Sequence, residues 1–131
     1  PMVNPDVSVI IPAFHFEDSV RKVILAIVKQ SVRVNEIVIV DSSTNEKVKE
    51  VIQEFKKDQV QINYVRKDKA YPGEARNIGA KLASSDLLAF LDSKTVPTND
   101  WLEKNLNLLF RDNVDVVVDT NVAGVMCSSL Q

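Results

Sequence analysis

The chain has 131 residues, of which 45% are apolar and 26% are charged, and its formal net charge is −2. This size and composition fit a single soluble globular domain with one core, and they exclude a disordered chain. The 16 Lys and Arg residues form no basic block, so we expect no nucleic-acid partner. No apolar run approaches the roughly 18 residues that a membrane span needs, so we expect no membrane span. No signal peptide is evident, so we expect a cytoplasmic location.

Strand-like and helix-like segments alternate along the chain. Short β-branched runs predict strands, and apolar residues at three- and four-residue spacing predict helices. In chain order, the expected elements are a strand at 7–11, a helix through 20–28, a strand at 36–40, a helix through 48–55, a strand at 61–65, a helix through 72–82, a strand at 87–91, a helix through 102–109 and a strand at 114–118.

Local signals add detail to three of these segments. Ser43-Thr44-Asn45-Glu46 has the pattern of a capping box, which would open the second helix. Gly79 would let the third helix pack closely. Residues 121–131 show no clear pattern, so we expect one domain over 1–131 that ends in an irregular tail at 121–131.

Strands with little polar alternation, separated by helices, predict a doubly wound α/β fold with a mainly parallel sheet and helices on both faces. In such folds ligands bind outside the carboxyl ends of the strands, near the switch in strand order. Four segments follow expected strand ends: Pro12-Ala13-Phe14-His15, Asp41-Ser42-Ser43-Thr44, Arg66-Lys67-Asp68-Lys69 and Asp92-Ser93-Lys94-Thr95.

Two of these segments begin with a carboxylate. Asp41 could accept hydrogen bonds from a nucleobase or a ribose, and Asp92 could bind a divalent cation or a ribose hydroxyl. Each could equally cap the turn that follows it. Other nucleotide-binding patterns are missing, because the chain has neither G-x-G-x-x-G nor a P-loop. Because the chain has one Cys and one His, an internal disulfide and a Cys- or His-rich metal site are both excluded.

Three segments, in order, resemble family 2 glycosyltransferases. "VSVIIPAFHFEDSVRKVILAIVKQS" is similar to the family's V-S-V-I-I-P-[TA]-[YF]-N opening, and "EIVIVDSSTNE" to its E-I-[IV]-V-V-D-D-G-S-T-D. "PGEARNIGAKLASSDLLAFLDSKTVPTNDWLEKNL" is similar to its G-x-x-x-A-R-N-x-G segment, followed by F-L-D-[SA]-D-D. The resemblance runs from about Val7 to about Asp119 and implies a GT-A fold, as the N-terminal nucleotide-sugar-binding half of such an enzyme.

The resemblance implies that a nucleotide-diphosphate sugar is bound and that its sugar is transferred to an acceptor with inversion. Asp41 would contact the base, and Arg76 would lie in the pocket floor, where it could offset diphosphate charge or pair with Asp92 or Asp41. No residue is nominated as the catalytic base. The donor-binding residues that the resemblance implies are Pro12, Ala13, Phe14, Asp41, Ser42, Arg76, Asp92 and Ser93.

Lys94 departs from the family, because it stands where the second acid of the D-x-D motif is expected. At ~4 Å and an effective dielectric constant of ~20, one charge contact is worth about 4 kcal/mol, enough to cancel the help of one carboxylate ligand. The resemblance implies Mn²⁺ or Mg²⁺ at Asp92, and Lys94 argues against it. Lys94 could instead neutralise the diphosphate without a metal, or it could be a solvated loop lysine.

The chain also ends soon after the fifth expected strand, whereas the family's acceptor-binding part follows this half. We therefore expect either a fragment or a short relative. The alternative function is a non-catalytic GT-A-like module that binds a nucleotide or a partner. A homodimer that covers exposed sheet edges is left open.

Overall fold

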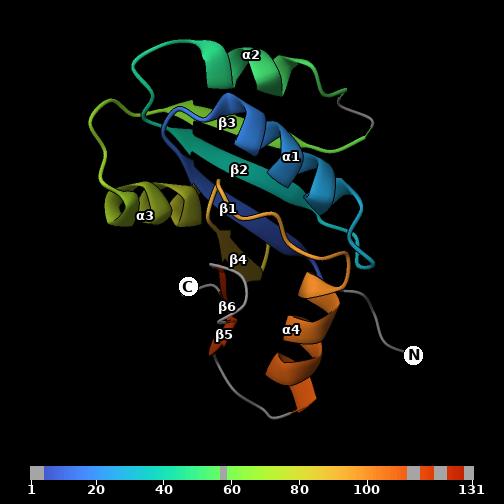
Figure 1. Ribbon diagram of the computed structural model, residues 1–131. Helices are drawn as coiled ribbons and strands as arrows, with labels where there is room; N and C mark the ends of the chain where they lie inside the picture. Colours follow the sequence, from blue (N-terminus) through green and yellow to red (C-terminus); the bar gives the residue numbers. More distant parts are fainter. Residues whose placement is uncertain (1–4, 57–58, 112–115, 120–123, 129–131) are drawn as a thin grey trace.

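The computed structural model describes residues 5–56, 59–111, 116–119 and 124–128 (Figure 1). Strands and helices alternate through most of the chain, as the sequence predicts. The elements are β1 (Val7–Ala13), α1 (Glu17–Val28), β2 (Glu36–Asp41), α2 (Lys47–Gln53), β3 (Ile62–Arg66), α3 (Pro72–Leu82), β4 (Leu87–Leu91), α4 (Trp101–Arg111), β5 (Val116–Asp119) and β6 (Gly124–Ser128).

One sheet contains all of these strands, in the order β3-β2-β1-β4-β6-β5. The first four strands in sequence are parallel to one another, and β6 is antiparallel to both β4 and β5. The prediction of a mainly parallel, doubly wound α/β fold is therefore confirmed. The strand order switches direction between β1 and β4, so the carboxyl ends of β1, β2, β3 and β4 form one edge around this switch point. We call it the carboxyl edge.

The prediction of an irregular tail is wrong for Gly124–Ser128, which forms β6. This strand pairs with β4 on one side and β5 on the other. Its conformation thus depends on hydrogen bonds to two other strands, which a five-residue pattern does not reveal. The fifth expected strand at 114–118 appears as β5 at Val116–Asp119, and residues 114–115 lie outside the described residues.

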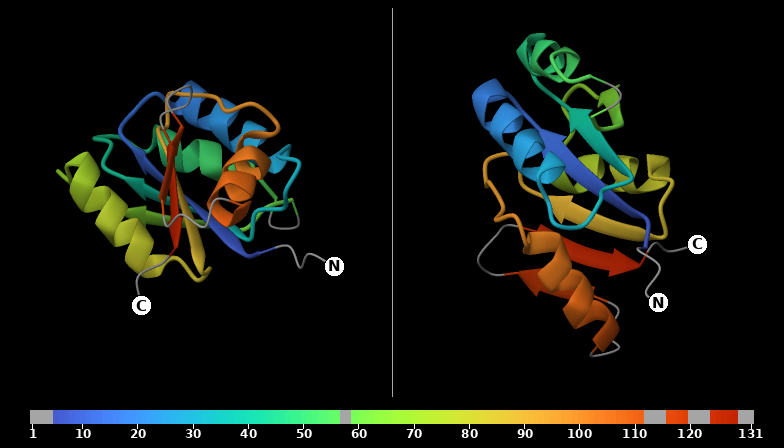
Figure 2. Two further views of the ribbon diagram at one scale, coloured as in Figure 1. Left: turned by 90° about the horizontal axis from the view of Figure 1, so that it is seen from below. Right: turned by 90° about the vertical axis from the view of Figure 1, so that its right-hand side faces the viewer.

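Helices cover both faces of the sheet (Figure 2): α1, α2 and α4 lie on one face and α3 on the other. Side chains of β1 alternate between the two layers, since Val9 and Ile11 pack with α1 and Ile10 packs with α3. The strand is apolar throughout because both of its faces are covered. A Cβ on Gly79 would lie 2.4 Å from Ile10 Cγ2, which confirms the close helix packing expected at Gly79.

The predicted capping box at the start of α2 does not form. The Ser43 hydroxyl instead accepts the His15 backbone N–H at 2.7 Å, and the Glu46 carboxylate lies 3.3 Å from the Arg66 guanidinium. Asn45 Oδ1 accepts the Lys47 N–H at 3.1 Å. Donors from the loop after β1 and from β3 thus engage both capping side chains, and the local sequence pattern includes neither donor.

In the described part of the chain, none of the helices combines the length and the apolar character that a membrane crossing requires.

Candidate functional site

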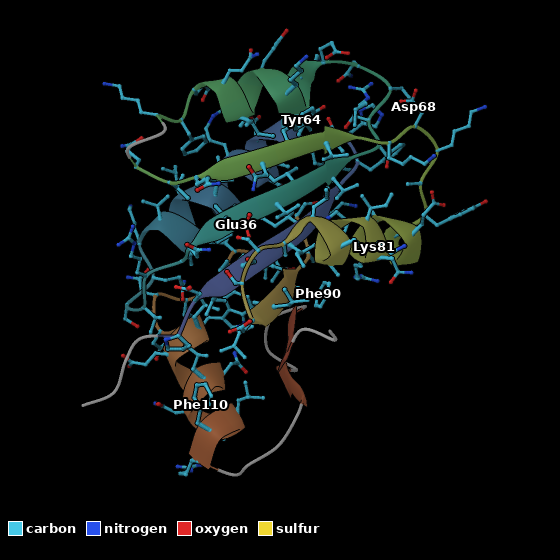
Figure 3. The ribbon with its side chains drawn as sticks, turned by 180° about the vertical axis from the view of Figure 1, so that it is seen from behind. Glu36, Tyr64, Asp68, Lys81, Phe90 and Phe110 are labelled. Carbon is cyan, nitrogen blue, oxygen red and sulfur yellow. The ribbon has the colours of Figure 1, made fainter. Side chains whose placement is uncertain are left out.

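A cavity of about 340 Å³ lies at the carboxyl edge. Its walls come from three successive strand ends: Phe14 follows β1, the segment 42–44 follows β2, and Arg66 ends β3. The volume falls in the range of small-ligand pockets. Figure 3 shows Asp68 near this end of β3, whereas Glu36 lies at the opposite, amino end of β2. The lining residues are Phe14, Ser42, Ser43, Thr44, Arg66, Asp68 and Lys69.

Asp41, the last residue of β2, lies beneath this cavity with a side chain that is 0% exposed. Its Oδ1 accepts the Ser43 N–H at 2.9 Å, and its Oδ2 accepts the Tyr64 hydroxyl at 2.6 Å. Burial and this hydrogen bond to Asp41 raise the pKa of Tyr64 to about 12, so the phenol remains a donor at neutral pH. The carboxylate therefore fixes the backbone of the segment that lines the cavity.

Arg66 joins the β2–α2 loop to β3. Its Nη2 donates to the Ser43 carbonyl at 2.5 Å, and its Nη1 donates to the Asn45 carbonyl at 3.1 Å. Its guanidinium also lies 3.3 Å from a carboxylate oxygen of Glu46 and 3.3 Å from one of Asp68. A carboxylate oxygen of Asp41 lies 3.9 Å away. Two carbonyls and three carboxylates thus surround one cation, which holds the cavity wall but leaves little of its charge for a ligand.

The loop after β1 is tied to the loop after β2. His15 and Phe16 both have left-handed backbone angles, with φ of 58° and 56°, which non-glycine residues adopt only when surrounding contacts favour them. His15 Nε2 accepts the Thr44 N–H at 3.3 Å and lies 3.0 Å from the Thr44 hydroxyl. The Phe14 ring meets the His15 ring edge to face at 4.4 Å. These contacts fix the position of Phe14 at the cavity.

The end of β4 forms a second part of the carboxyl edge, on the other side of β1 from β2. Asp92 is half-buried, and its Oδ1 accepts the Lys94 backbone N–H at 3.0 Å. Ser93 is buried, while Lys94 is exposed and places its Nζ 4.2 Å from the centre of the Phe16 ring. Asp41 and Asp92 both accept the N–H two residues on, so each does stabilise the turn that follows its strand.

Comparison with known proteins identifies the family to which this chain belongs. The sequence matches the model of glycosyl transferase family 2 over residues 8–129. The chain belongs to this family. A glycosyltransferase of Haemophilus influenzae is 31% identical over 115 residues, which cover 86% of this chain and 46% of that protein.

Two solved structures share the fold. The mannosyltransferase PcManGT of Pyrobaculum calidifontis, solved with GDP-Man and Mn²⁺, has a TM-score of 0.82 at 15% identity. The match covers 95% of this chain and 45% of the PcManGT chain. Residues 1–349 of S. aureus TarS, solved with UDP-GlcNAc, have a TM-score of 0.72 at 22% identity. The match covers 85% of this chain and 33% of the TarS chain. These are GT-A glycosyltransferases, so the predicted GT-A fold is confirmed. This chain covers less than half the length of each of the three proteins.

The residues predicted to bind the donor lie in different parts of the structure. Phe14 and Ser42 line the cavity. Pro12 and Ala13 end β1 and pair with Val40 and Asp41, beneath it. Asp92, Ser93 and Lys94 follow β4, on the other side of β1 at the switch point, and they do not line the cavity. Arg76 is exposed on α3 and, among the described residues, pairs with neither Asp41 nor Asp92. The donor contacts of all these residues stay predictions.

The predicted site residues do not include Ser43, Thr44, Arg66, Asp68 and Lys69, which line the cavity, or Tyr64, which binds Asp41 beneath it. The rule of strand ends did point to the segments of Thr44, Arg66 and Lys69, but it does not say which side chains turn toward a ligand. Tyr64 lies inside β3 and resembles any other aromatic strand residue. No signal in the sequence links it to Asp41.

The residues at the end of β4 do not fit a divalent cation of the kind that family resemblance implies. Within the part of the chain that the structure describes, no group of three or more His, Cys, Asp and Glu side chains could hold a metal ion. Asp92 gives one oxygen to its own turn, and the residue two places on is a cation rather than a second acid.

Proposed function

We propose that this chain is the donor-binding part of a glycosyltransferase. It binds a nucleoside diphosphate sugar at the carboxyl edge, and the enzyme to which it belongs transfers that sugar to an acceptor with inversion at the anomeric carbon. The observation that carries the proposal is the cavity of about 340 Å³ that three parallel strand ends form in a member of glycosyl transferase family 2.

The cavity has the chemistry that a nucleoside needs. The Phe14 ring is 55% exposed at its wall and can stack on a base. The hydroxyls of Ser42 and Thr44 can hydrogen-bond a base edge or a ribose. Asp41 keeps their loop in place from below, and Pro12 and Ala13 support the floor. PcManGT and TarS were solved with GDP-Man and UDP-GlcNAc, which supports a nucleoside diphosphate sugar as the ligand class.

The diphosphate needs positive charge, and breaking its bond to the sugar develops more negative charge on it. Arg76 and Lys94 supply this charge, and Lys69 lies at the cavity itself. Asp92 and Ser93 face the ribose and the sugar side of the donor. In this arrangement the chain binds the donor and stabilises the leaving diphosphate.

Thermal unfolding with UDP, GDP, CDP and ADP tests donor binding. A ligand present at 100 times its Kd stabilises the folded state by about 2.7 kcal/mol, so at least one diphosphate is expected to raise the Tm by several degrees. No increase with any of the four would refute donor binding. Release of free nucleotide from UDP-Glc or GDP-Man then separates an enzyme from a module that only binds.

Two matched phenylalanines locate the binding site. Phe14→Ala is expected to weaken binding of the preferred nucleotide about fivefold to hundredfold, because stacking on an aromatic ring contributes about 1–3 kcal/mol per base. Phe110→Ala is the control, since Phe110 is 56% exposed but lies on α4, away from the cavity (Figure 3). Equal effects of the two substitutions would place the nucleotide elsewhere.

A further inference from the structure

Lys94 is oriented by an aromatic ring. Its Nζ lies 4.2 Å from the centre of the Phe16 ring, within the ~6 Å over which a ring attracts a cation. It forms no ion pair with any carboxylate of the described residues. By contrast, Arg66 at the end of β3, on the same carboxyl edge, has Glu46 and Asp68 as partners.

The kind of partner decides what the cation can do. A carboxylate cancels the charge of the ammonium it holds. An aromatic ring restricts the position of the ammonium through its quadrupole but carries no net charge of its own. Lys94 therefore keeps its full positive charge while its position is restricted. An ammonium of this kind is a suitable point-charge partner for phosphate oxygens.

The loop after β1 connects Lys94 to the cavity. Phe14 lines the cavity and Phe16 holds Lys94, and these two residues are separated only by His15. Two residues span at most about 7 Å of chain. The ammonium is thus one short loop away from the cavity wall, on the side of the switch point between β1 and β4.

The turn after β4 supports the same arrangement. Asp92 accepts the backbone N–H of Lys94, so the carboxylate fixes the backbone from which the ammonium projects. A divalent ion at this place would have one carboxylate as its ligand and an ammonium as its neighbour, which opposes it.

We propose that the Lys94 ammonium, held over the Phe16 ring, receives the diphosphate of the donor and takes the place of a divalent cation. Nucleoside diphosphate binding at this edge is then independent of metal. This inference rests on the proposed function and adds the way in which the donor's charge is neutralised.

Calorimetric titration with UDP and GDP, and with uridine and guanosine, tests the inference in EDTA and again in MnCl₂. The unaltered chain is expected to bind its preferred diphosphate with a Kd that differs less than twofold between the two buffers. Lys94→Ala is expected to weaken diphosphate binding about tenfold to hundredfold, because hydrogen bonds between charged groups are of that strength. Binding of the nucleoside should change less than twofold. Lys81→Ala, an exposed lysine at the far end of α3, is the control.

Three further variants sharpen the result. Lys94→Arg retains a cation that also stacks on aromatic rings, so it is expected to retain metal-independent binding. Phe16→Leu keeps an apolar side chain but removes the quadrupole, and should weaken diphosphate binding severalfold. Lys94→Asp restores an acid pair with Asp92 and is expected to lose binding in EDTA and regain it with Mn²⁺.

Two results would overturn the inference while leaving the proposed function intact: diphosphate binding that requires Mn²⁺ in the unaltered chain, or diphosphate binding that Lys94→Ala leaves unchanged. If neither nucleosides nor diphosphates bind in either buffer, the proposed function itself fails and the inference fails with it.

Discussion

The hydrogen bond from Tyr64 to Asp41 should be one of the strongest single contacts that hold the cavity floor. It is 2.6 Å long, and its acceptor is a carboxylate with a fully buried side chain. Hydrogen bonds to charged groups contribute about 1.5–3 kcal/mol. Tyr64→Phe is therefore expected to lower the free energy of unfolding by about this amount at pH 7, since it leaves one carboxylate oxygen with a single, 3.9 Å contact to Arg66.

Urea unfolding monitored by the fluorescence of Trp101, the only tryptophan and a buried one, measures this loss. A double-mutant cycle with Asp41→Asn isolates the pairwise energy, which should exceed about 1 kcal/mol for two groups in direct contact. Tyr71→Phe is the control, because Tyr71 is 80% exposed, and surface substitutions of this kind stay within about 0.5 kcal/mol. A coupling energy near zero, or equal losses for Tyr64→Phe and Tyr71→Phe, would refute the reasoning.

The same contact has a signature at high pH. Because the folded-state pKa of Tyr64 is raised to about 12 from 10.0, its stabilising contribution is fully present below pH 10 and is lost as the pH rises through about 12. Absorbance titration of phenolate should therefore show one late-titrating tyrosine, which Tyr64→Phe removes. If the late step persists in that variant, the assignment is wrong.

Three further outcomes follow from the packing and polar contacts. Gly79→Ala should be less stable than Gly73→Ala by about 1–3 kcal/mol in urea unfolding, because its Cβ would lie 2.4 Å from a side-chain atom of Ile10, whereas Gly73 has nothing within 4 Å. Burial alone would raise the pKa of Glu36, but the hydrogen bonds it accepts outweigh burial and lower it. The ionised Glu36 side chain should thus stabilise the fold above pH 4.5, and this stabilisation should be lost as the pH falls through the lower pKa of the folded state. In Glu36→Gln, the free energy of unfolding should therefore fall less steeply toward acid pH. His15→Ala should weaken nucleotide binding severalfold in calorimetry without a change of fold by circular dichroism, because it frees the Thr44 loop.

The sequence predicted the edge of the sheet that holds the site more successfully than the residues that shape it. Parallel strands covered on both faces leave apolar runs, and these located β1, β2 and β4. Each run ends where polar residues begin, which placed Asp41 and Asp92 at the carboxyl edge.

The contacts that determine the cavity shape connect residues far apart in the sequence. Tyr64 meets Asp41 across two strands, and His15 reaches Thr44 across two loops. Neither pair leaves a local pattern. The prediction of a capping box at Ser43 and Glu46 was wrong for the same reason, because these two side chains bind His15 and Arg66 instead.

Chemical-shift mapping of backbone amides during titration with UDP and GDP tests the central claim, which is that a nucleoside diphosphate binds at the carboxyl edge. The account predicts saturable shifts for Phe14, for residues 42–44 and for residues 66–69, together with Lys94 when the ligand carries the diphosphate. Saturable shifts confined to the amino edge around Glu36, or no shifts with either nucleotide, would contradict it.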